Sequence, residues 1–294
     1  MTKTQKKAKA RAIRESQKKI KMIKKMKNDY PTIKTVEVEE KTKRFIEAEE
    51  MELFDAEGRH ITRWKGIVNK EQKGQMFNIV GRGYKIAQHD DVIEAIEESV
   101  NDLELTHNER IVTLNEGARV HAIMNFPKIV ERLSNGETLE LRVTFDNSYD
   151  STTGLRMVLG STTSKGYYLL TSESYGTYYH RHTKGMDTRN LKKKLEKGID
   201  VFRNKIIAKF EQMLSSKLDI ATVINFLDKC IKEKVISVKY LEMIRDKLDT
   251  LKASDVDSQY ALYNMIAEVL SAQVESIDAQ KRHMETMYNK VKQL

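Results

Sequence analysis

Residues 118–145 read ARVHAIMNFPKIVERLSNGETLELRVTF, and this stretch decides the fold class. Apolar side chains recur through Ala118–Asn125 and again through Thr138–Phe145. The Ser-Asn-Gly sequence at 134–136 lies between the two runs and has the composition of a tight turn. Short apolar runs separated by turn residues predict strands of an antiparallel sheet.

Similar short runs continue on both sides of this stretch. Turn-rich segments at 55–59, 115–117 and 146–154 separate them. From Asp90 to Leu103 the apolar period becomes helical, with Asp90 as the expected N-cap, so a helix should cross the sheet. The further predicted strands are Thr35–Glu39, Ile61–Trp64, Gly66–Val68, Met76–Val80, Ile111–Leu114, Leu155–Leu159, Tyr167–Thr171 and Tyr175–Tyr179.

After residue 188 the pattern is helical throughout. Apolar residues from Leu191 to Leu214 recur at three- and four-residue spacing and predict one long helix. Further helices are expected over Ile220–Lys234 and Val238–Leu251, and from Ser258 to near the C-terminus. The expected caps of these three helices are Asp219, Ser237 and Asp257.

The last of these helices, read as uninterrupted, would be on the order of 50 Å long. We therefore expect part of its apolar stripe to contact another helix or a second subunit, and we expect a homo-oligomer. The alternative is that it packs along the helix beginning at Asn190 within one chain. The fold class predicted is α+β: an antiparallel sheet with a crossing helix, followed by a C-terminal all-helical region. The expected divisions are a basic tail (1–30), an α+β core domain (31–188) and a helical assembly region (189–294).

Positive charge is concentrated at the N-terminus. Residues 1–28 contain twelve Lys and Arg and one acid, Glu15, which gives them a net charge of +11. Because the whole chain carries +9, residues 29–294 carry −2. A cluster of Lys and Arg with few aromatic residues favours binding to a polyanion through counterion release. The alternative is a solvated tail that serves solubility.

Composition excludes several classes of protein. No window approaches eighteen consecutive apolar residues, and Lys and Arg interrupt the N-terminus where a secretory signal would need an apolar stretch. Cys230 is the only cysteine, so neither an intrachain disulfide nor a cysteine zinc site is expected. We expect a protein of the cytoplasm that contacts no membrane.

The densest polar cluster runs from Tyr178 to Gly185. Arg offers a bidentate fork to phosphate, Lys a point charge and Tyr a stacking face for a base. Three lysines at 192–194 add a second basic run, which could equally be the solvated face of a helix. The predicted nucleic-acid-binding residues are Arg82, Lys85, Arg156, Lys165, Tyr178, Tyr179, Arg181, His182, Lys184, Lys192, Lys193 and Lys194.

Catalytic interpretations are weaker. His180 and His182, two residues apart on a strand, would point to one face and could bind a metal with Asp146 or Asp150. A metal-dependent nuclease is thus a third interpretation, but we expect no enzyme, no metal and no cofactor. The sequence has no Gly-Lys-Ser/Thr phosphate loop, so action on DNA should proceed without ATP.

Four segments resemble a family of uncharacterised proteins encoded by phages and plasmids. The resembling segments occur in the family's order over roughly residues 45–275 and are Gly83–Asp90, Phe145–Thr152, Arg181–Lys184 and Tyr260–Glu268. The strand–helix order is similar, at the level of the fold, to single-strand annealing recombinases of the Red-beta and Erf kind. That resemblance implies rings or filaments that hold single-stranded DNA by its backbone.

The function expected from these features is ATP-independent binding and annealing of single-stranded DNA in phage recombination, in a bacterial host's cytoplasm. The sequence leaves open whether the nucleic acid is DNA or RNA. The alternative is a structural or interaction protein of a phage particle, whose basic tail contacts the genome or an acidic partner.

Overall fold

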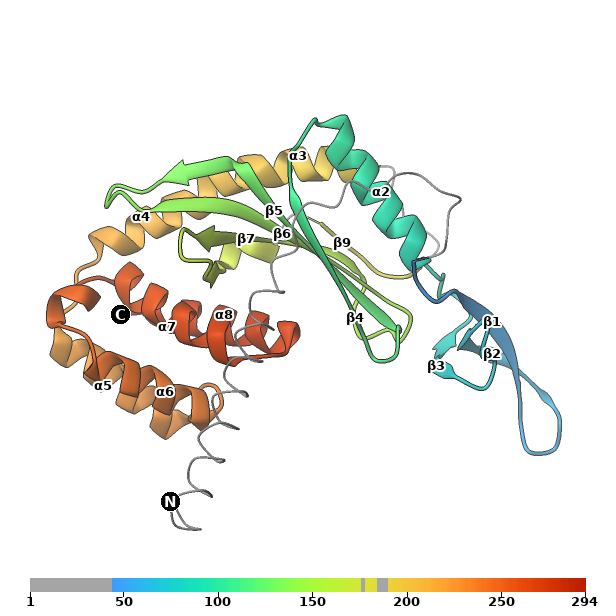
Figure 1. Cartoon of the computed structure of the whole chain (residues 1–294). Helices are drawn as coiled ribbons and strands as arrows, with labels where there is room; N and C mark the ends of the chain where they lie inside the picture. The colour runs from blue at the N-terminus through green and yellow to red at the C-terminus, as the bar shows by residue number, and fades with distance from the viewer. Residues whose placement is uncertain (1–43, 176–177, 184–189) are drawn as a thin grey trace, which may run out of the picture. The chain divides into compact units, whose positions relative to one another are not determined.

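The computed structural model describes residues 44–175, 178–183 and 190–294, which form two antiparallel sheets and a set of helices (Figure 1). The predicted α+β class with a C-terminal helical region is confirmed. The basic tail and the predicted strand Thr35–Glu39 lie outside the described residues.

The small sheet has the strand order β1-β2-β3. Strands β2 (His60–Asn69) and β3 (Met76–Gly81) contain the predicted apolar runs, and the turn at 55–59 is confirmed. Strand β1 (Ala48–Phe54) was missed, because three of its seven residues are glutamates and Glu is depleted in strands. The sheet packs through a small apolar cluster that includes Ala48 and Ile67.

The large sheet contains the stretch that decides the fold class. Its order is β4-β5-β6-β7-β8, and a further short strand, β9, also pairs with β7. Pro127 lies in β5 within a register shift between Phe126 and Val130, where it removes no ladder hydrogen bond. The strands are β4 (Asn108–Leu114), β5 (Arg119–Arg132), β6 (Thr138–Ser148), β7 (Leu155–Thr163), β8 (Tyr168–Leu169) and β9 (Tyr178–His180).

The two faces of the large sheet differ in chemistry. Phe145 of β6 is directly opposite Ala122 of β5 and Met157 of β7, and this face is apolar. Helix α3 packs on it so closely that a Cβ at Gly198 would lie 3.0 Å from a methyl of Leu159. The next residue of β6, Asp146, points to the other face, so alternation along the strand makes one face polar.

Helix α2 (His89–Asp102) is the predicted crossing helix, but the expected N-cap was wrong. The N-cap is Gln88, and Asp90 lies in the first turn. Helix α2 follows a short link from the small sheet and contacts both α3 and β6. A short 3₁₀ segment, η1 (Ser172–Tyr175), includes Tyr175 and precedes β9.

The predicted long helix over 191–214 is confirmed. It runs from α3 (Leu191–Val201) through a π-helical segment, η2 (Phe202–Ile206), into α4 (Ile207–Ser215). Helices α5 (Ile220–Glu233) and α6 (Val238–Asp249) follow, and Asp219 caps α5 as expected by accepting from the Thr222 N–H. Ser237 is at the N-cap of α6 but makes no side-chain capping bond.

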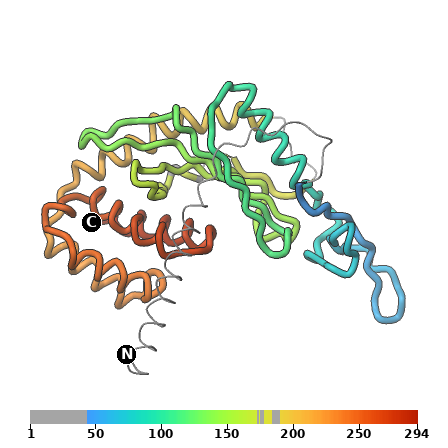
Figure 2. Tube along the Cα trace, viewed as in Figure 1, coloured from blue at the N-terminus to red at the C-terminus, as the bar shows by residue number. Residues whose placement is uncertain are grey.

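The prediction of one uninterrupted helix from Ser258 to near the C-terminus was wrong. After a 3₁₀ turn, η3 (Ala253–Val256), the chain forms α7 (Gln259–Gln273), reverses, and forms α8 (Ile277–Val291), as the tube trace in Figure 2 shows. Ser258 rather than Asp257 caps α7. The apolar stripe, for which another helix, a second subunit or intrachain packing was considered, is buried within the chain, with Leu270 fully buried and the Tyr263 and Tyr288 rings in edge contact.

One apolar core extends from Ala87 to Val291 and includes residues on both sides of position 188. The predicted boundaries at residues 30 and 188 stay predictions. Within the described residues, no helix combines the length and apolar character needed to cross a membrane.

Candidate nucleic-acid interface

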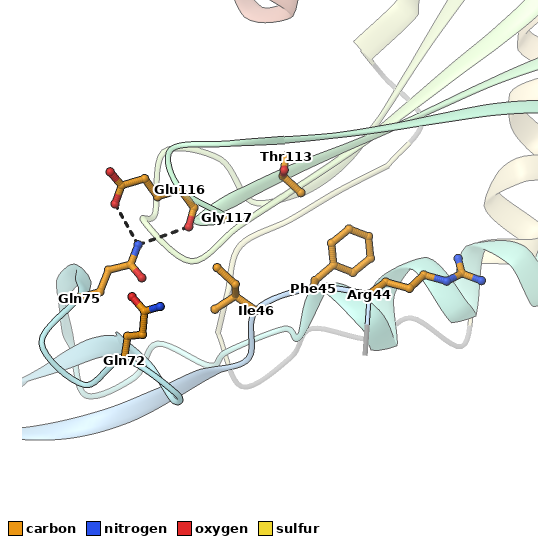
Figure 3. Close-up of a pocket in the computed structure, with 8 residues that line it drawn as sticks. All are labelled: Arg44, Phe45, Ile46, Gln72, Gln75, Thr113, Glu116 and Gly117. Atoms are coloured by element: carbon orange, nitrogen blue, oxygen red, sulfur yellow. Dashed lines mark hydrogen bonds between the residues drawn. The ribbon is translucent and has the colours of Figure 1, made fainter. Parts of the chain in front are cut away.

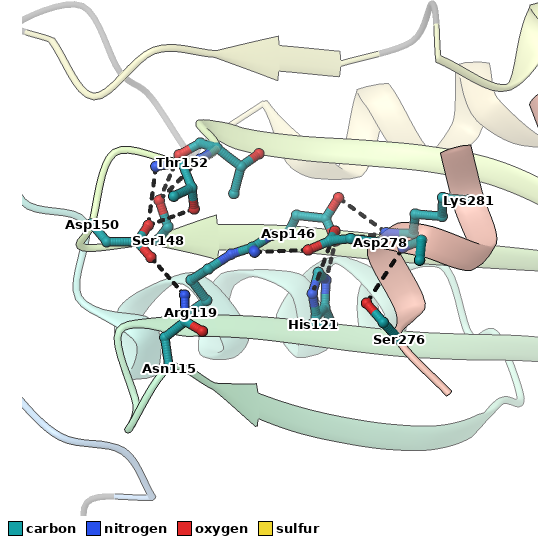
Figure 4. Close-up of polar contacts among 12 residues, drawn as sticks. Asn115, Arg119, His121, Asp146, Ser148, Asp150, Thr152, Ser276, Asp278 and Lys281 are labelled. Atoms are coloured by element: carbon teal, nitrogen blue, oxygen red, sulfur yellow. Dashed lines mark hydrogen bonds and ion pairs between the residues drawn. The ribbon is translucent and has the colours of Figure 1, made fainter. Parts of the chain in front are cut away.

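The polar face of the large sheet holds a buried carboxylate. Asp146 of β6 lies directly opposite His121 of β5 and Arg156 of β7, so these three side chains share one face. Lys281 of α8 reaches the same carboxylate, with its Nζ 2.8 Å from Oδ1 and 3.1 Å from Oδ2. Arg156 donates to Oδ2 through Nη2 at 2.7 Å and Nε at 3.0 Å, and His121 donates to Oδ1 through Nδ1 (Figure 4).

The three partners keep Asp146 ionised. Burial alone would raise its pKa, but Lys281, His121 and Arg156 together hold the pKa below its usual range. Burial in turn lowers the pKa of Lys281, against the opposing effect of Asp146. A carboxylate held by three donors is poorly suited to accept a proton from a substrate. Asp146 therefore positions cations rather than serving as a base.

A second carboxylate, that of Asp278, is more exposed to solvent than Asp146. Asp278, in the first turn of α8, accepts from Arg119 Nη1 at 2.7 Å. Its other oxygen is 3.8 Å from His121 Nε2, which is too long for a hydrogen bond. Ser276 caps α8 by accepting from the Ala279 N–H, and an acid in the first turn is favourable to the helix dipole.

These groups surround a cavity of about 410 Å³, which we call the basic pocket. Four basic and two acidic side chains line it, so its lining has a net charge of +2 before the buried Asp146 is counted. Arg282 is exposed and makes no ion pair with any residue that the structure describes. The lining residues are Arg119, Thr152, Thr153, Arg156, Ser276, Asp278, Lys281, Arg282 and Glu285.

An aromatic side chain lies beside the pocket. Tyr179 of β9 is directly opposite Arg156 of β7 and so emerges on the same face of the sheet. Tyr179 is 56% exposed, whereas Tyr178, its neighbour in β9, is 5% exposed and belongs to the core. Of the two predicted stacking residues, only Tyr179 therefore presents its ring to solvent. Arg181, two residues further on, is also exposed.

The other predicted residues lie elsewhere. Lys165 follows the far end of β7, more than about 20 Å from Arg156 at ~3.3 Å per residue. Three lysines, at 192, 193 and 194, are on α3, which packs on the apolar face of the sheet, and Lys192 is 3.4 Å from Asp102. Lys184 lies outside the described residues.

Arg82, Lys85 and His182 lie at the small sheet. Arg82 pairs with Glu52, which raises the pKa of Arg82. Lys85 is exposed, and its backbone N–H donates to the His182 carbonyl. His182 itself is buried against the Tyr84 ring, and burial lowers its pKa. The twelve predicted residues are thus distributed over several places rather than one surface.

The two-histidine metal hypothesis assumed that His180 and His182 continue one strand. Strand β9 ends at His180, so the alternation rule does not extend to His182. Asp146 is held by three donors from Lys281, Arg156 and His121, and Asp150 accepts from Asn115 Nδ2 and the Thr152 N–H. Among the described residues, no group of three or more His, Cys, Asp or Glu could hold a metal ion.

A second cavity, of about 490 Å³, lies where the small sheet approaches the β4–β5 turn (Figure 3). The Gln75 amide donates to the carboxylate of Glu116 at 3.1 Å, and Ile46 packs on Gly117. Gly117 has φ +87°, and a Cβ there would lie 2.6 Å from Ile46 Cδ1, so only glycine fits. With one Arg and one Glu in its lining, this cavity is less suited to an anion than the basic pocket is.

Sequence reasoning missed Arg119, His121, Asp278 and Lys281. A weak signal was present for His121, a polar residue at alternate spacing within the apolar run of β5. Lys281 is 135 residues from Asp146, and no local pattern predicts that pairing. Comparison with known proteins gives no match of the chain to a family model, a curated protein or a solved structure. The resemblance to phage and plasmid proteins stays a prediction.

Proposed function

We propose that the protein binds single-stranded nucleic acid at the basic pocket, with phosphate oxygens on Arg119 and Arg282 and a base stacked on Tyr179. The observation that carries this proposal is the exposed Tyr179 ring directly opposite Arg156, which is one of the four basic side chains that line the cavity. Backbone contact plus aromatic stacking is how proteins bind single strands without reading sequence. A duplex keeps its bases stacked inside and offers none to Tyr179.

The buried Asp146 makes the pocket rigid. It fixes Arg156 of β7 and Lys281 of α8, so their positive charge is held in place before any ligand arrives. Fixed charges lose little entropy when a phosphate binds. Annealing, a role in phage recombination and assembly into oligomers extend this proposal and rest on the resemblance alone.

Fluorescence anisotropy with a labelled 20-nucleotide DNA strand tests the proposal. Arg282→Gln should weaken binding and reduce the log–log salt slope by about 0.7, the value for one phosphate contact with a single strand. Lys165→Gln removes an exposed lysine at the opposite end of β7 and serves as the matched control. If the two variants lose affinity and salt slope equally, binding does not depend on the basic pocket, and the proposal fails.

A protein-interaction role is the second candidate, because the outer face of the small sheet is apolar. Trp64 and Ile79 are each 50% exposed and Met76 is 42% exposed. Side chains of Met51 and Met76 gather over Gly66 on this face. Contiguous apolar patches of this kind mark interaction sites.

Sedimentation velocity over a range of concentrations tests whether that patch joins copies of the chain. For that role, the wild type should self-associate, and Trp64→Ser with Ile79→Ser should sediment as a folded monomer. A wild type that stays monomeric at every concentration would remove self-association through this face.

A further inference from the structure

The first turn of α8 opens onto the basic pocket. The first backbone N–H groups of a helix have no partner within the helix, and here the Ser276 hydroxyl accepts from one of them, the Ala279 N–H. Ile277 and Asp278 start the helix, and the helix dipole places partial positive charge at this end. A helix terminus of this kind accepts an oxyanion when further donors point at it.

His121 points toward the first turn of α8. Its side chain is fully buried, and Nδ1 is committed to Asp146. Nε2 has no hydrogen-bond partner among the described residues, and the acceptor that faces it is Asp278 Oδ1 at 3.8 Å. Arg119 Nε, on the same face of β5, is also buried without a partner among those residues. Buried groups left unpaired in this way are uncommon in folded proteins, and two of them meet here.

Asp278 occupies the position that an incoming anion would take. One carboxylate oxygen contacts Arg119 and the other faces His121 Nε2, so the carboxylate lies between the two incompletely satisfied side chains. The Asp278 side chain is 26% exposed, so it has solvent to turn toward. An anion with more oxygens could bond Arg119, and it could also bond His121 when the imidazole carries a proton on both nitrogens and Nε2 becomes a donor.

We infer that the basic pocket receives the terminal phosphate of a nucleic-acid strand, in place of the Asp278 carboxylate. This inference rests on the function proposed above and names the part of the strand that enters. A terminal phosphate has three unbridged oxygens and a charge near −2, whereas an internal phosphodiester has two and a charge of −1. Donors approach the pocket from β5, β7, the loop at 152–153 and α8, which suits a group with oxygens on several sides.

The test compares four DNA ligands of one sequence by anisotropy: a strand with a 5′-phosphate, one with a 3′-phosphate, one with hydroxyls at both ends, and a closed circle. We expect at least one phosphorylated strand to bind roughly tenfold more tightly than the strand with two hydroxyl ends. The tenfold preference corresponds to about 1.4 kcal/mol. The circle should bind like the strand with hydroxyl ends.

Two variants locate the effect. Asp278→Asn removes the competing charge and frees Arg119, and it should strengthen binding of the preferred phosphorylated strand roughly threefold more than binding of the hydroxyl-ended strand. His121→Asn keeps a donor near Nδ1 for Asp146 but removes Nε2, and it should abolish the preference. Circular dichroism melting reports whether each variant is folded, and if His121→Asn is not, the Asp278→Asn result alone decides.

The outcomes separate the inference from the proposed function. Equal affinity of all four ligands overturns the terminal-phosphate site and leaves nucleic-acid binding intact. Failure of all four to bind overturns both. Vesicles containing phosphatidic acid present the same phosphate monoester on a lipid, and binding to these without binding to any strand would overturn the assignment to nucleic acid.

Discussion

His89 is a neutral histidine held in the interior, and its surroundings account for that state. Its Nε2 donates to the Gly117 carbonyl at 3.1 Å, and its Nδ1 accepts from the Asn147 amide at 2.9 Å. The ring stacks on Tyr149 at 3.8 Å. Burial lowers the pKa of His89 to about 4, only partly offset by the backbone carbonyl of Gly117.

The lowered pKa makes stability depend on pH. In the unfolded chain His89 gains its proton near pH 6.5, but in the folded protein only near pH 4. Between these values the unfolded state binds more protons, so the stability contributed by neutral His89 is complete above pH 6.5 and is lost as pH falls toward 4. The decrease in unfolding free energy should reach about 3 kcal/mol.

Urea unfolding at pH 7, 5.5 and 4.5 measures this. His89→Gln should lower stability at pH 7, because the stack on Tyr149 is removed, and should flatten the decline from pH 7 to 4.5 relative to wild type. Parallel declines in the two proteins would mean that another group is responsible. His182, whose pKa burial also lowers, is the first alternative, and His182→Gln is its control.

Asp146 shows where sequence reasoning fails at this scale. The run Asp-Asn-Ser at 146–148 has turn-forming composition, and a loop was expected from Asp146 onward. Pairing with β5 and β7 instead extends β6 to Ser148 and turns Asp146 toward Lys281. Local preference is overridden by strand partners and by a countercharge that lie far away in the sequence.

The α7–α8 hairpin is the element that most changes the expectations from sequence. The chain lacks Gly and Pro where the two helices meet, so the apolar stripe predicts one continuous helix. The signal for a break was Ser276 followed by Asp278, an N-cap with an acid in the first turn. The reversal brings Lys281 against the large sheet and so builds one wall of the basic pocket.

Replacing Leu270 and Val274 by Asp tests where this stripe is buried. Leu270 is fully buried and Val274 is 6% exposed within the chain, so two carboxylates there should unfold the protein. Circular dichroism should show loss of the native signal at 25 °C. A variant that stays folded and only dissociates by light scattering would instead restore the subunit contact first expected for this stripe.

At the scale of the whole molecule, charge is divided between the tail and the body. Residues 1–28 carry +11, and the remainder of the chain is nearly neutral. We expect the tail to supply affinity that does not depend on strand ends and the basic pocket to supply the defined contacts. Salt weakens the contacts of both the tail and the basic pocket, but the tail has more charges and so contributes more to the slope of log affinity against log salt concentration.

Deleting residues 1–28 should therefore weaken binding to single strands and flatten its salt dependence, by about 0.7 in log–log slope for each phosphate that the tail neutralises. Anisotropy titrations from 50 to 300 mM salt measure the slope. If truncated and full-length proteins share one slope, the tail does not touch the nucleic acid.

The fold class, most strands and the order of helices could be predicted from sequence, because apolar periodicity and turn residues are local. The candidate site could be predicted only in part. Arg156 and Tyr179 were named, but Arg119 and Lys281 reach the same pocket through strand register and the hairpin at the C-terminus. Contacts of this kind depend on the folded arrangement of β5, β7 and α8.

Photocrosslinking tests the central claim most directly. A single strand carrying 5-iodouracil, irradiated in complex with the full chain and digested, reports by mass spectrometry which side chain stacks on a base. We predict a crosslink to Tyr179, which disappears in Tyr179→Leu while binding weakens. Crosslinks confined to the basic tail or to Trp64 of the small sheet, with Tyr179 unmodified, would contradict binding at the basic pocket.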